Sequence, residues 1–400
     1  MAQLPATHRQ LLALLLVATS AVQAQSTRLA SLPLEAMQTM AAVFGLIRSD
    51  YVTPVDSERL IAACTKGMFK ELDSASAYLD ADALNDLMSR RQTDAVGIGV
   101  ELVHRAGLPS IVSTHEGSPA ERAGLKPRDY LLDIDGESLE ETELSQVIAR
   151  LKGRPGSELT LTIRRPGESA PRTLKLEREA VQLKPVTGQR WAGNLGYLRV
   201  RSLRENTAAE LRSVFRELQQ GGRLTGLVLD LRHSPGGLLE TSVEVAAMFL
   251  PEQAIVTRTE GRLPEANHTY TADRAEVRKN SRARQDAWPE ALTTLPLVVL
   301  VDAGTASGAE IIAAALRDNG RARLLGSKTF GRGSIQTVRR LSVNNAVKLT
   351  TAVYRTPGGQ LLQDRGLQPD QALPDLDRPE LAGSDQDPAL PKARALLAPG

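Results

Sequence analysis

Apolar residues recur at helical spacing from residue 33 to residue 93. The repeat returns over 55–72, and Asp56 stands where the N-cap of that second helix belongs. We therefore predict an N-terminal helical section over 25–93. Such a section can pack on the rest of the chain or on a second copy in a homodimer, and the pattern fits both. The apolar positions of the first helix are Leu34, Met37, Val43, Phe44 and Ile47.

From Asp94 the pattern changes to short apolar strands separated by glycine turns. Asp135-Gly136 is a hairpin signal, and 117–125 contains a turn, one helical turn and a glycine stop. A helix is expected over 139–151. Short strands around two helices predict one compact domain over 94–182. The strands are expected at 96–103, 111–113, 130–134 and 159–164.

Beyond residue 183, apolar strands alternate with helices. Strands that are apolar throughout and alternate with helices belong to a sheet covered on both faces, so the predicted fold class is α/β, with a core domain over 183–375. Residues 376–400 are rich in Pro, Ala and Asp, and we expect a loose C-terminal tail there. The core strands are predicted at 195–200, 226–231 and 296–301, and the helices at 207–218, 239–249 and 309–316.

Residues 1–24 have the three parts of a secretory signal peptide. His8 and Arg9 precede the apolar run 11–17, and small residues follow up to Ala24. The run is too short to span a bilayer comfortably, and no later stretch reaches the ~18 apolar residues of a membrane helix. We expect export, a mature chain that starts near Gln25 and has no membrane span, and a periplasmic location in a Gram-negative host.

Composition and charge exclude several classes of function. Lys and Arg number 49 against 47 Asp and Glu, a net charge of +2, and aromatic residues make up 3% of the 400 residues. A nucleic-acid binder is therefore not expected. The single cysteine, Cys64, excludes an intrachain disulfide, and the histidines form no metal-ligand pair. Gly97-Ile98-Gly99 opens no helix and so is not a dinucleotide fingerprint. We predict no metal and no cofactor.

The most informative chemistry lies between the strand at 296–301 and the helix that follows it. Small residues turn the chain there, and the helix begins at Ser307. A hydroxyl at the end of a strand, beside the unpaired N–H groups of a helix N-terminus, suits a nucleophile with an oxyanion site. Ser307 with Glu310 is also an S-x-x-E capping box, and the local pattern alone favours that structural role.

Two further glycine-rich segments follow or precede predicted strands. Asp230-Leu231-Arg232-His233-Ser234-Pro235-Gly236-Gly237 comes at the end of another buried strand, and a third segment covers 326–336. Strand ends at one edge of such a sheet share a crevice in which ligands bind. Gly236 and Gly237 can offer backbone donors there, or they can form a plain strand-to-helix turn.

The order of these motifs resembles that of the carboxy-terminal processing peptidases, also called tail-specific proteases. The resemblance covers roughly 35–375, and the ordered set makes it specific, since any one motif alone is weak. The set is Gly67-Met68-Phe69-Lys70-Glu71-Leu72-Asp73 with Tyr78-Leu79, Gly97-Ile98-Gly99-Val100, Gly117-Ser118-Pro119-Ala120, Asp135-Gly136, Asp230-Leu231-Arg232 with Pro235-Gly236-Gly237, Thr305-Ala306-Ser307, Thr329-Phe330-Gly331 with Gly333 and Gln336, and Gly366-Leu367-Gln368-Pro369-Asp370.

The resemblance implies a crotonase/ClpP-like α/β peptidase core with an inserted PDZ domain. In such a domain a peptide adds as a strand and its terminal carboxylate lies on backbone N–H groups. Gly97, Ile98, Gly99 and Val100 match that turn. The implied partners are the C-terminal segments of protein substrates, and an adaptor protein is compatible with the resemblance.

The resemblance also implies a serine nucleophile with a neutral lysine as its base. Ser307 matches the nucleophile, and Gln336 matches the glutamine that orients the base. Gly308, together with Gly236 or Gly237, matches the oxyanion hole.

The base itself departs from the family pattern. Where the family has Lys in a Gly-Lys-Gly turn, this chain has Gly331-Arg332-Gly333. An arginine is not deprotonated in proteins, so Arg332 cannot be the general base. His233-Ser234 replaces an Asn-Asn pair, and His233 can serve either as a substitute base or, as we favour, as a surface turn histidine.

Two hypotheses of function follow. In the first, the chain is an exported serine endopeptidase that cleaves with Ser307 and an altered base. In the second, it has lost hydrolysis and binds C-terminal peptides through its PDZ domain. The retained Ser307 and Gln336 favour the first hypothesis, and Arg332 favours the second.

Overall fold

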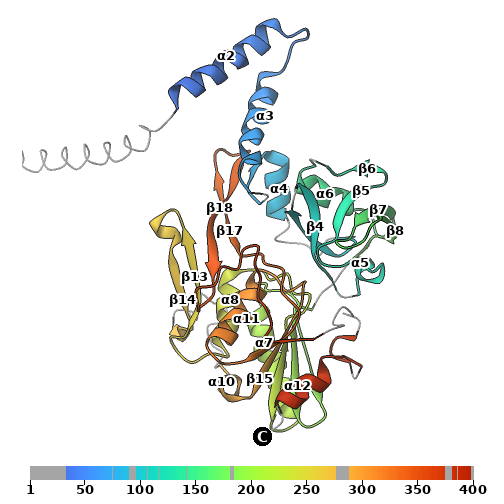
Figure 1. Cartoon of the computed structure of the whole chain (residues 1–400), viewed down its shortest axis with the longest axis vertical. Coiled ribbons are helices and arrows are strands. Elements are labelled where there is room, and N and C mark those ends of the chain that lie inside the picture. The colour runs from blue at the N-terminus through green and yellow to red at the C-terminus, as the bar shows by residue number, and fades with distance from the viewer. Residues whose placement is uncertain are drawn as a thin grey trace, which may run out of the picture. The chain divides into compact units, whose positions relative to one another are not determined.

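Figure 1 shows the computed structural model of the chain. The structure describes residues 33–400 apart from 74, 90–95, 106, 116, 141, 181–183, 276–287, 374–380, 385 and 398–400. The predicted signal peptide therefore lies outside the described residues. The chain divides into two compact units, one up to Met68 and one from Phe69 onward.

The first unit consists of the helices α2 (Leu34–Asp50) and α3 (Ser57–Lys70), the latter continuing into the second unit. Asp56 Oδ1 accepts a hydrogen bond from the N–H of Arg59 at 2.8 Å, as predicted for the N-cap of α3. Neither helix contains a buried residue. Pairing of these helices with a second copy stays a prediction. Within the described part of the chain, no helix is long and apolar enough to cross a membrane.

The second unit begins with a short strand, β1 (Ala77–Leu79), and helix α4 (Ala81–Ser89). The predicted helical section thus contains a strand, because β1 pairs with strand β18 (Ala346–Arg355) from far along the chain. Three residues carry too little periodicity to be recognised as a strand without that partner. Asp80 Oδ1 accepts from the N–H of Ala83 and begins α4.

The domain predicted over 94–182 forms a six-stranded sheet with two helices. The strand order is β3-β4-β5-β7-β8, with β6 paired to β5, and β2 pairs separately with β9. Helix α6 lies beside the edge strand β3. The predicted helix begins at Leu144 rather than at residue 139, since Glu137 and Ser138 pair with β5 as β6 and the chain then turns. The elements are β2 (Val96–Gly97), β3 (Val100–Arg105), β4 (Leu108–Thr114), α5 (Pro119–Arg122), β5 (Tyr130–Ile134), β6 (Glu137–Ser138), α6 (Leu144–Leu151), β7 (Glu158–Arg164), β8 (Arg172–Glu177) and β9 (Glu179–Ala180).

The core domain is built on a six-stranded sheet of order β10-β11-β12-β15-β16-β19. β10 and β11 are antiparallel, and every later neighbour is parallel. Parallel neighbours need crossover connections, which helices supply from β11 to β16, whereas β17 (Ser334–Arg340) and β18 lie in the connection from β16 to β19. The elements are β10 (Val186–Trp191), β11 (Leu195–Val200), α7 (Thr207–Gln220), β12 (Gly226–Asp230), α8 (Leu239–Ala247), α10 (Ala291–Thr294), β15 (Leu297–Val301), α11 (Gly308–Asp318), β16 (Arg323–Gly326) and β19 (Gln371–Ala372).

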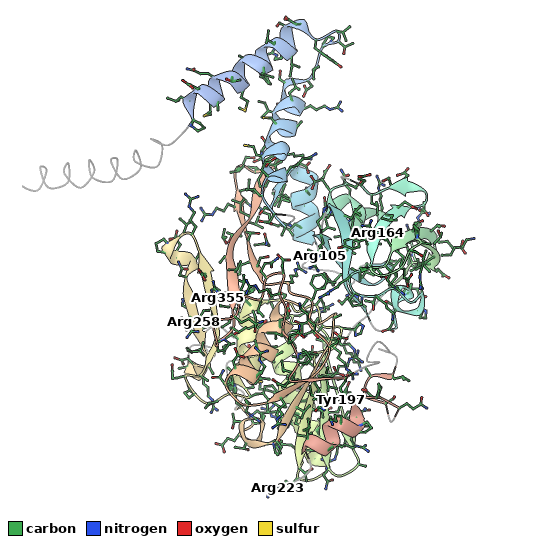
Figure 2. The ribbon with its side chains drawn as sticks, viewed as in Figure 1. Arg105, Arg164, Tyr197, Arg223, Arg258 and Arg355 are labelled. Atoms are coloured by element: carbon green, nitrogen blue, oxygen red, sulfur yellow. The ribbon has the colours of Figure 1, made fainter. Side chains whose placement is uncertain are left out.

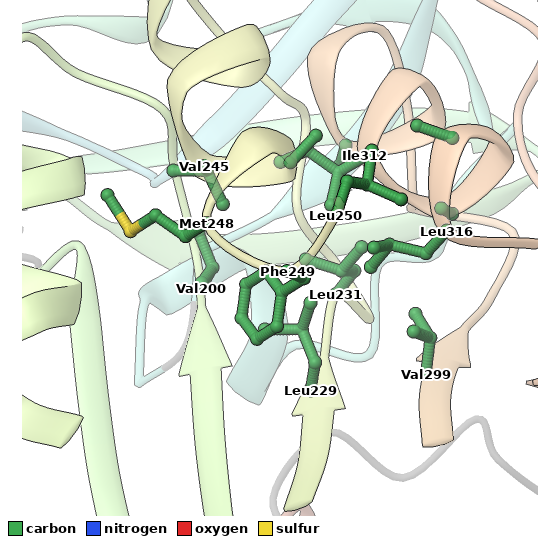
Figure 3. Close-up of a cluster of buried hydrophobic side chains, with 14 of the residues drawn as sticks. Val200, Leu229, Leu231, Val245, Met248, Phe249, Leu250, Val299, Ile312 and Leu316 are labelled. Atoms are coloured by element: carbon green, nitrogen blue, oxygen red, sulfur yellow. The ribbon is translucent and has the colours of Figure 1, made fainter. Parts of the chain in front are cut away.

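Alternate residues of this sheet pack on opposite layers. Figure 3 shows Leu229, Val299 and their neighbours packed against α8, the residues just after it, and α11. The strand residues between them, among them Val228 and Leu300, pack with Leu390 of helix α12 (Leu390–Leu397) on the other face. Both faces are therefore covered, as the apolar strands predicted.

A second sheet has the order β1-β18-β13-β14, and a fifth strand, β17, also pairs with β18. Arg258 of β13 stands opposite Arg355 of β18, and Figure 2 shows these two residues close to each other. β17 starts directly after the Gly331-Arg332-Gly333 turn, so this sheet extends from the candidate site. Its remaining elements are β13 (Ile255–Gly261), the 3₁₀ turn Pro264–Ala266, β14 (His268–Thr271) and β17 (Ser334–Arg340).

The expectation of a loose tail over 376–400 is wrong for its described residues, 381–384 and 386–397. Asp387 is 1% exposed and forms an ion pair with Arg232 at 2.6 Å. Leu390 and Leu397 of α12 are buried on the core sheet. Composition suggested a tail because the segment is rich in Pro, Ala and Asp, but Ala389, Leu390, Ala393 and Leu397 pack in one cluster with residues of the sheet.

Candidate active site

The three loop segments singled out in the sequence meet at one edge of the core sheet. β12 and β15 are parallel neighbours, so the segments that follow them leave the sheet at the same edge. The N–H of Ala306 donates to the carbonyl of Ser234 at 2.9 Å, and Thr305 Oγ1 donates to the carbonyl of Leu231 at 2.8 Å. The N–H of Phe330 donates to the carbonyl of Thr305 at 3.0 Å and joins the third segment.

Ser307 occupies a strained backbone position between β15 and α11. Its φ is 51° and its ψ is −120°. Non-glycine residues rarely adopt positive φ, and such strain persists only where surrounding contacts impose it. An ordinary N-cap has an extended backbone, which gives no reason for this strain. The side chain is half-buried. The geometry is that of a serine presented on a sharp strand-to-helix turn.

Two of the predicted oxyanion glycines lie against Ser307. A Cβ atom on Gly236 would stand 2.5 Å from the backbone N of Gly308 and 3.0 Å from Ser307 Cβ. A Cβ atom on Gly308 would stand 2.2 Å from Ser242 Oγ. Only glycine fits at either position. Gly308 is the first residue of α11, where backbone N–H groups have no acceptor inside the helix.

Gly237 faces a different neighbour. A Cβ atom there would stand 2.1 Å from the carbonyl oxygen of Leu203, with which Gly237 forms an isolated parallel bridge. Gly237 therefore fixes the turn against the Leu203 segment, and Gly236 is the glycine in contact with the Ser307 turn.

The Glu310 carboxylate is hydrogen-bonded to both the Ser307 turn and the Gly331–Arg332 segment. Its Oε2 accepts from the N–H groups of Ser307 and Arg332, each at 2.9 Å. Its Oε1 accepts from the N–H of Gly331 at 2.9 Å and from Thr329 Oγ1. Burial raises the pKa of Glu310 to about 7, although these hydrogen bonds oppose the rise. The bond to Ser307 is the carboxylate half of the predicted capping box. The sequence did not show that the same carboxylate also holds 329–332.

Arg332 is brought next to Ser307 through its main chain. The two backbone N–H groups share one oxygen of Glu310. The side chain is half-buried, and among the residues that the structure describes its guanidinium has no hydrogen-bond or ion-pair partner. Burial raises the pKa of Tyr354, and the nearby charge of Arg332 opposes that rise. Because a guanidinium keeps its proton in proteins, it supplies charge here and no base.

Gln336 lies on β17, four residues beyond Arg332. Its Nε2 donates to Ser334 Oγ at 3.1 Å and to Thr350 Oγ1 at 2.9 Å, and its Oε1 accepts from Thr350 Oγ1 at 3.1 Å. No hydrogen bond between Gln336 and Ser307 or the Arg332 side chain is present among the described residues. The side-chain amide of Gln336 is thus hydrogen-bonded to residues of β17 and β18.

His233 is not a surface turn histidine, and that interpretation is wrong. Its side chain is 9% exposed, and Nδ1 lies 2.5 Å from Asp302 Oδ2. Its N–H also donates to Asp302 Oδ1 at 2.9 Å. Burial lowers the pKa of His233, but the Asp302 carboxylate outweighs it and the net shift is upward. Burial acts to raise the pKa of Asp302, but the charge of His233, its hydrogen bonds and the charge of Arg232 together outweigh it and hold that pKa at about 2. The structure records no bond from His233 to Ser307.

Asp302 is a site residue that sequence reasoning missed. It follows the last residue of β15 and receives bonds from Gly304, Thr305 and His233 on Oδ1. A polar residue directly after a buried strand is the signal that could have found it.

The candidate peptide-binding turn begins the 94–182 domain. The carbonyl of Ile98 accepts from the N–H of Ala120 at 2.9 Å, and the carbonyl of Gly99 accepts from the N–H of His115 at 2.8 Å. Gly99 has a φ of 78°. Val100 starts the edge strand β3 and Ile148 lies on α6, and both pack, partly buried, against the same apolar cluster.

The 94–182 domain also contacts the core near Ser307. Val112 packs with Ala306 and Phe330 in one apolar cluster. Arg128 donates to the carbonyl of Thr329 at 3.1 Å. Within the described residues, no three His, Cys, Asp or Glu side chains are grouped where they could hold a metal ion.

Comparison with known proteins finds two family models that match parts of this chain. A model of peptidase family S41 matches residues 194–373, and a model of the PDZ domain matches residues 110–165. The expectation of an α/β peptidase core with a PDZ domain is thereby confirmed.

Two curated relatives match most of the chain. A carboxy-terminal-processing protease of Bartonella bacilliformis is 35% identical over 341 residues, which are 83% of this chain and 75% of that protein. The carboxy-terminal processing protease CtpA of Bacillus subtilis is 32% identical over 324 residues, which are 81% of this chain and 66% of that protein. Among solved structures, a photosystem II D1 C-terminal processing protease has a TM-score of 0.69 and 31% identity, and the match covers 82% of this chain and 85% of that one.

Proposed function

Since the chain belongs to the carboxy-terminal processing peptidases of family S41, we propose that it is an exported serine endopeptidase that recognises protein C termini and cleaves with Ser307. The PDZ domain takes the terminal segment of the substrate, and the core cleaves a bond within reach of it. Export rests on the signal-peptide pattern of residues 1–24.

The backbone of Ser307 is the observation that carries this proposal. Its φ of 51° and ψ of −120° place the hydroxyl beside the helix N-terminus, against a glycine that no larger residue could replace. A tetrahedral oxyanion formed on a substrate carbonyl would meet the N–H of Gly308 and a donor of the Gly236 turn. A turn that served only to cap α11 would need neither the strain nor the glycine contact.

Substrate recognition rests on the edge strand β3. Among the described residues β3 pairs with one strand only, β4, and it contacts α6. An extended peptide can therefore add as a further strand, with its side chains between β3 and α6 and its carboxylate toward the turn of Gly97, Ile98, Gly99 and Val100.

We further propose that hydrolysis is slow, because Arg332 replaces the base. A general base typically contributes ~10²–10⁴ in rate. His233 is a poor substitute near pH 7, because no hydrogen bond from its side chain to Ser307 is present among the described residues and its raised pKa favours the protonated imidazole. Arg332 at the position of the base also favours the second candidate function, a peptide-binding protein that keeps the fold and the serine but hydrolyses peptides poorly or not at all.

The test is cleavage of an unfolded protein by the mature chain, with fragments measured by mass spectrometry. We expect slow cleavage by the native chain, none by Ser307→Ala, and faster cleavage by Arg332→Lys. Cleavage by the native chain that Arg332→Lys does not raise and His233→Ala does not lower would contradict our account of the base. Absence of cleavage by every variant would favour the peptide-binding function.

A further inference from the structure

The ladder between β17 and β18 is irregular at the position of Gln336. Ile335 pairs with Ala352, whereas Gln336 pairs with Thr350. β18 therefore has one residue more than β17 at this point, which is a β-bulge. A bulge bends its strand, interrupts the ladder hydrogen bonds and redirects the side chains beside it. The direction of the Gln336 side chain thus depends on what fixes β18 next to the bulge.

The group that fixes β18 there is the hydroxyl of Ser76. β1 pairs with Ala346–Lys348 of β18, and Thr350 lies beyond the end of that ladder. The N–H of Thr350 donates instead to Ser76 Oγ at 3.0 Å. Ser76 is 8% exposed, so water competes little for this hydrogen bond. A side chain 274 residues earlier in sequence thus takes the place of a ladder partner beside the bulge.

Asp73 determines how the Ser76 hydroxyl is used. Its Oδ2 accepts from Ser76 Oγ at 3.0 Å, and its Oδ1 accepts from the N–H groups of Ala75 at 2.8 Å and Ser76 at 2.9 Å. Partial burial acts to raise the pKa of Asp73, but hydrogen bonds from Ala75, Thr350 and Ser76 outweigh it and lower that pKa. The ionised carboxylate takes the single proton of the hydroxyl, which leaves Ser76 Oγ as the acceptor for the N–H of Thr350.

The Thr350 side chain connects this turn to Gln336. Thr350 Oγ1 lies 2.9 Å from Nε2 and 3.1 Å from Oε1 of Gln336, so one hydroxyl contacts both ends of the amide. The other partner of the amide, Ser334, lies on the same strand as Gln336. Thr350 is therefore the contact that fixes the amide relative to β18.

We propose that Ser76, held by Asp73, is a positioning residue for Gln336: it fixes β18 beside the bulge and thereby the direction of the Gln336 amide. The inference rests on the proposed function, since the role of Gln336 in orienting the base at position 332 comes from the family resemblance. It gives a part in the candidate site to the turn before β1, which the sequence connected with no chemistry.

The first test observes the Gln336 side chain and requires no hydrolysis. In the mature chain, the side-chain N–H₂ signal of Gln336 is assigned by its loss in Gln336→Met, and its exchange with water is measured by NMR. We expect Ser76→Ala to speed that exchange roughly threefold to tenfold, because Thr350 loses its anchor. Asp73→Ala should act in the same direction, since the Ser76 hydroxyl is then free to turn.

Two controls separate positioning from general loosening of the chain. Ser342→Ala removes an exposed hydroxyl at the tip of the same hairpin, where Oγ accepts from the N–H of Asn344 at 3.2 Å, and it should leave the exchange of Gln336 unchanged. The side-chain amide of Gln360, which donates to the carbonyl of Gly366 at 3.0 Å, is the internal reference. Unchanged exchange of Gln336 in Ser76→Ala would overturn the proposal, as would faster exchange that Gln360 shares.

The consequence for cleavage is measured in the background of Arg332→Lys, in which a lysine base is present. Adding Ser76→Ala should lower kcat roughly threefold to tenfold and leave KM unchanged, because the change acts on the orientation of the base and not on peptide binding. An unchanged kcat would overturn the positioning role. Absence of cleavage by Arg332→Lys itself would count against the proposed function, whereas the placement of Gln336 is decided by the exchange measurement alone.

Discussion

At the residue scale, Ser307 and His233 share an unusual backbone, with φ values of 51° and 54°. Both lie in segments that leave the same sheet edge, and both are fixed by a buried carboxylate, Glu310 for Ser307 and Asp302 for His233. The strain is thus imposed by hydrogen bonds to acidic side chains. The role of each carboxylate can be tested through a pKa: that of His233 for Asp302, and that of Glu310 itself.

Asp302→Asn should lower the pKa of His233. In the native chain the carboxylate outweighs burial, and the pKa of the imidazole is raised from 6.5. Without that negative charge, burial and the charge of Arg199 both favour the neutral imidazole, and the smaller effect of Glu121 opposes them. A histidine NMR titration of both proteins measures the change. Exposed His268 is the internal control. An unchanged titration of His233 would show that Asp302 does not set its charge.

Glu310→Gln should change how stability depends on pH. The pKa of Glu310 in the folded chain is about 7 against 4.5 for an ordinary Glu, so the folded state binds the proton more tightly than the unfolded state does. The stability from this group is full below about pH 4.5 and is lost as the pH rises toward about 7, by roughly 3 kcal/mol in all. Urea unfolding at pH 4.5 and 7.5 should show the native chain losing that stability relative to the variant. A constant difference between the two proteins would contradict the raised pKa.

At the element scale, the β15–turn–α11 unit was predictable because its signals are local. The apolar run 296–301 became β15 (Leu297–Val301), and the S-x-x-E pattern placed the helix start at Ser307. The strand β1 could not be predicted, since it exists only through pairing with β18. The burial of His233 could not be predicted either, because it depends on a partner, Asp302, that is 69 residues away in sequence. Local periodicity predicts elements, whereas side-chain burial at a loop depends on which loops the sheet brings together.

Gly236→Ala tests the close approach of two elements at the site. The φ of Gly236 is 84°, and a Cβ there would stand 2.5 Å from Gly308 N. Gly193 has a φ of 82° and no atom within 4 Å of the same position, so Gly193→Ala isolates the backbone strain. We expect about 1 kcal/mol of destabilisation from Gly193→Ala and a further ~1–3 kcal/mol from Gly236→Ala. Denaturant unfolding of both variants measures the difference. Equal losses would mean that the Ser307 turn has room to move away.

At the scale of the whole molecule, the last residues of the chain stabilise the segment that leads to the candidate site. Arg232, which precedes His233, lies between Asp230 of β12 and Asp387 of the C-terminal segment. Tyr197 donates to Asp230 at 2.6 Å, and the carbonyl of Gly383 accepts from Trp191 Nε1 at 3.1 Å. The buried network thus joins the strand before the oxyanion turn to residues about 150 positions later in sequence. Arg232 and Asp230 belong to the motif, but the role of Asp387 is visible only in the folded chain.

Asp387→Asn should therefore destabilise far more than the loss of an exposed ion pair. Arg232 is 2% exposed, and loss of one of its two anions leaves a buried positive charge less well compensated. We expect a loss of about 2 kcal/mol in the free energy of unfolding, since Asp230 still pairs with the guanidinium. Glu260→Gln is the matched control. It removes the partner of Arg355 in a pair whose side chains are 37% and 55% exposed, and it should cost at most about 1 kcal/mol. Urea unfolding compares the two variants, and limited proteolysis followed by mass spectrometry reports release of the segment around α12. If Asp387→Asn were no more costly than Glu260→Gln and left the segment protected, apolar packing of Leu390 and Leu397 would account for its attachment and the ion pair would not.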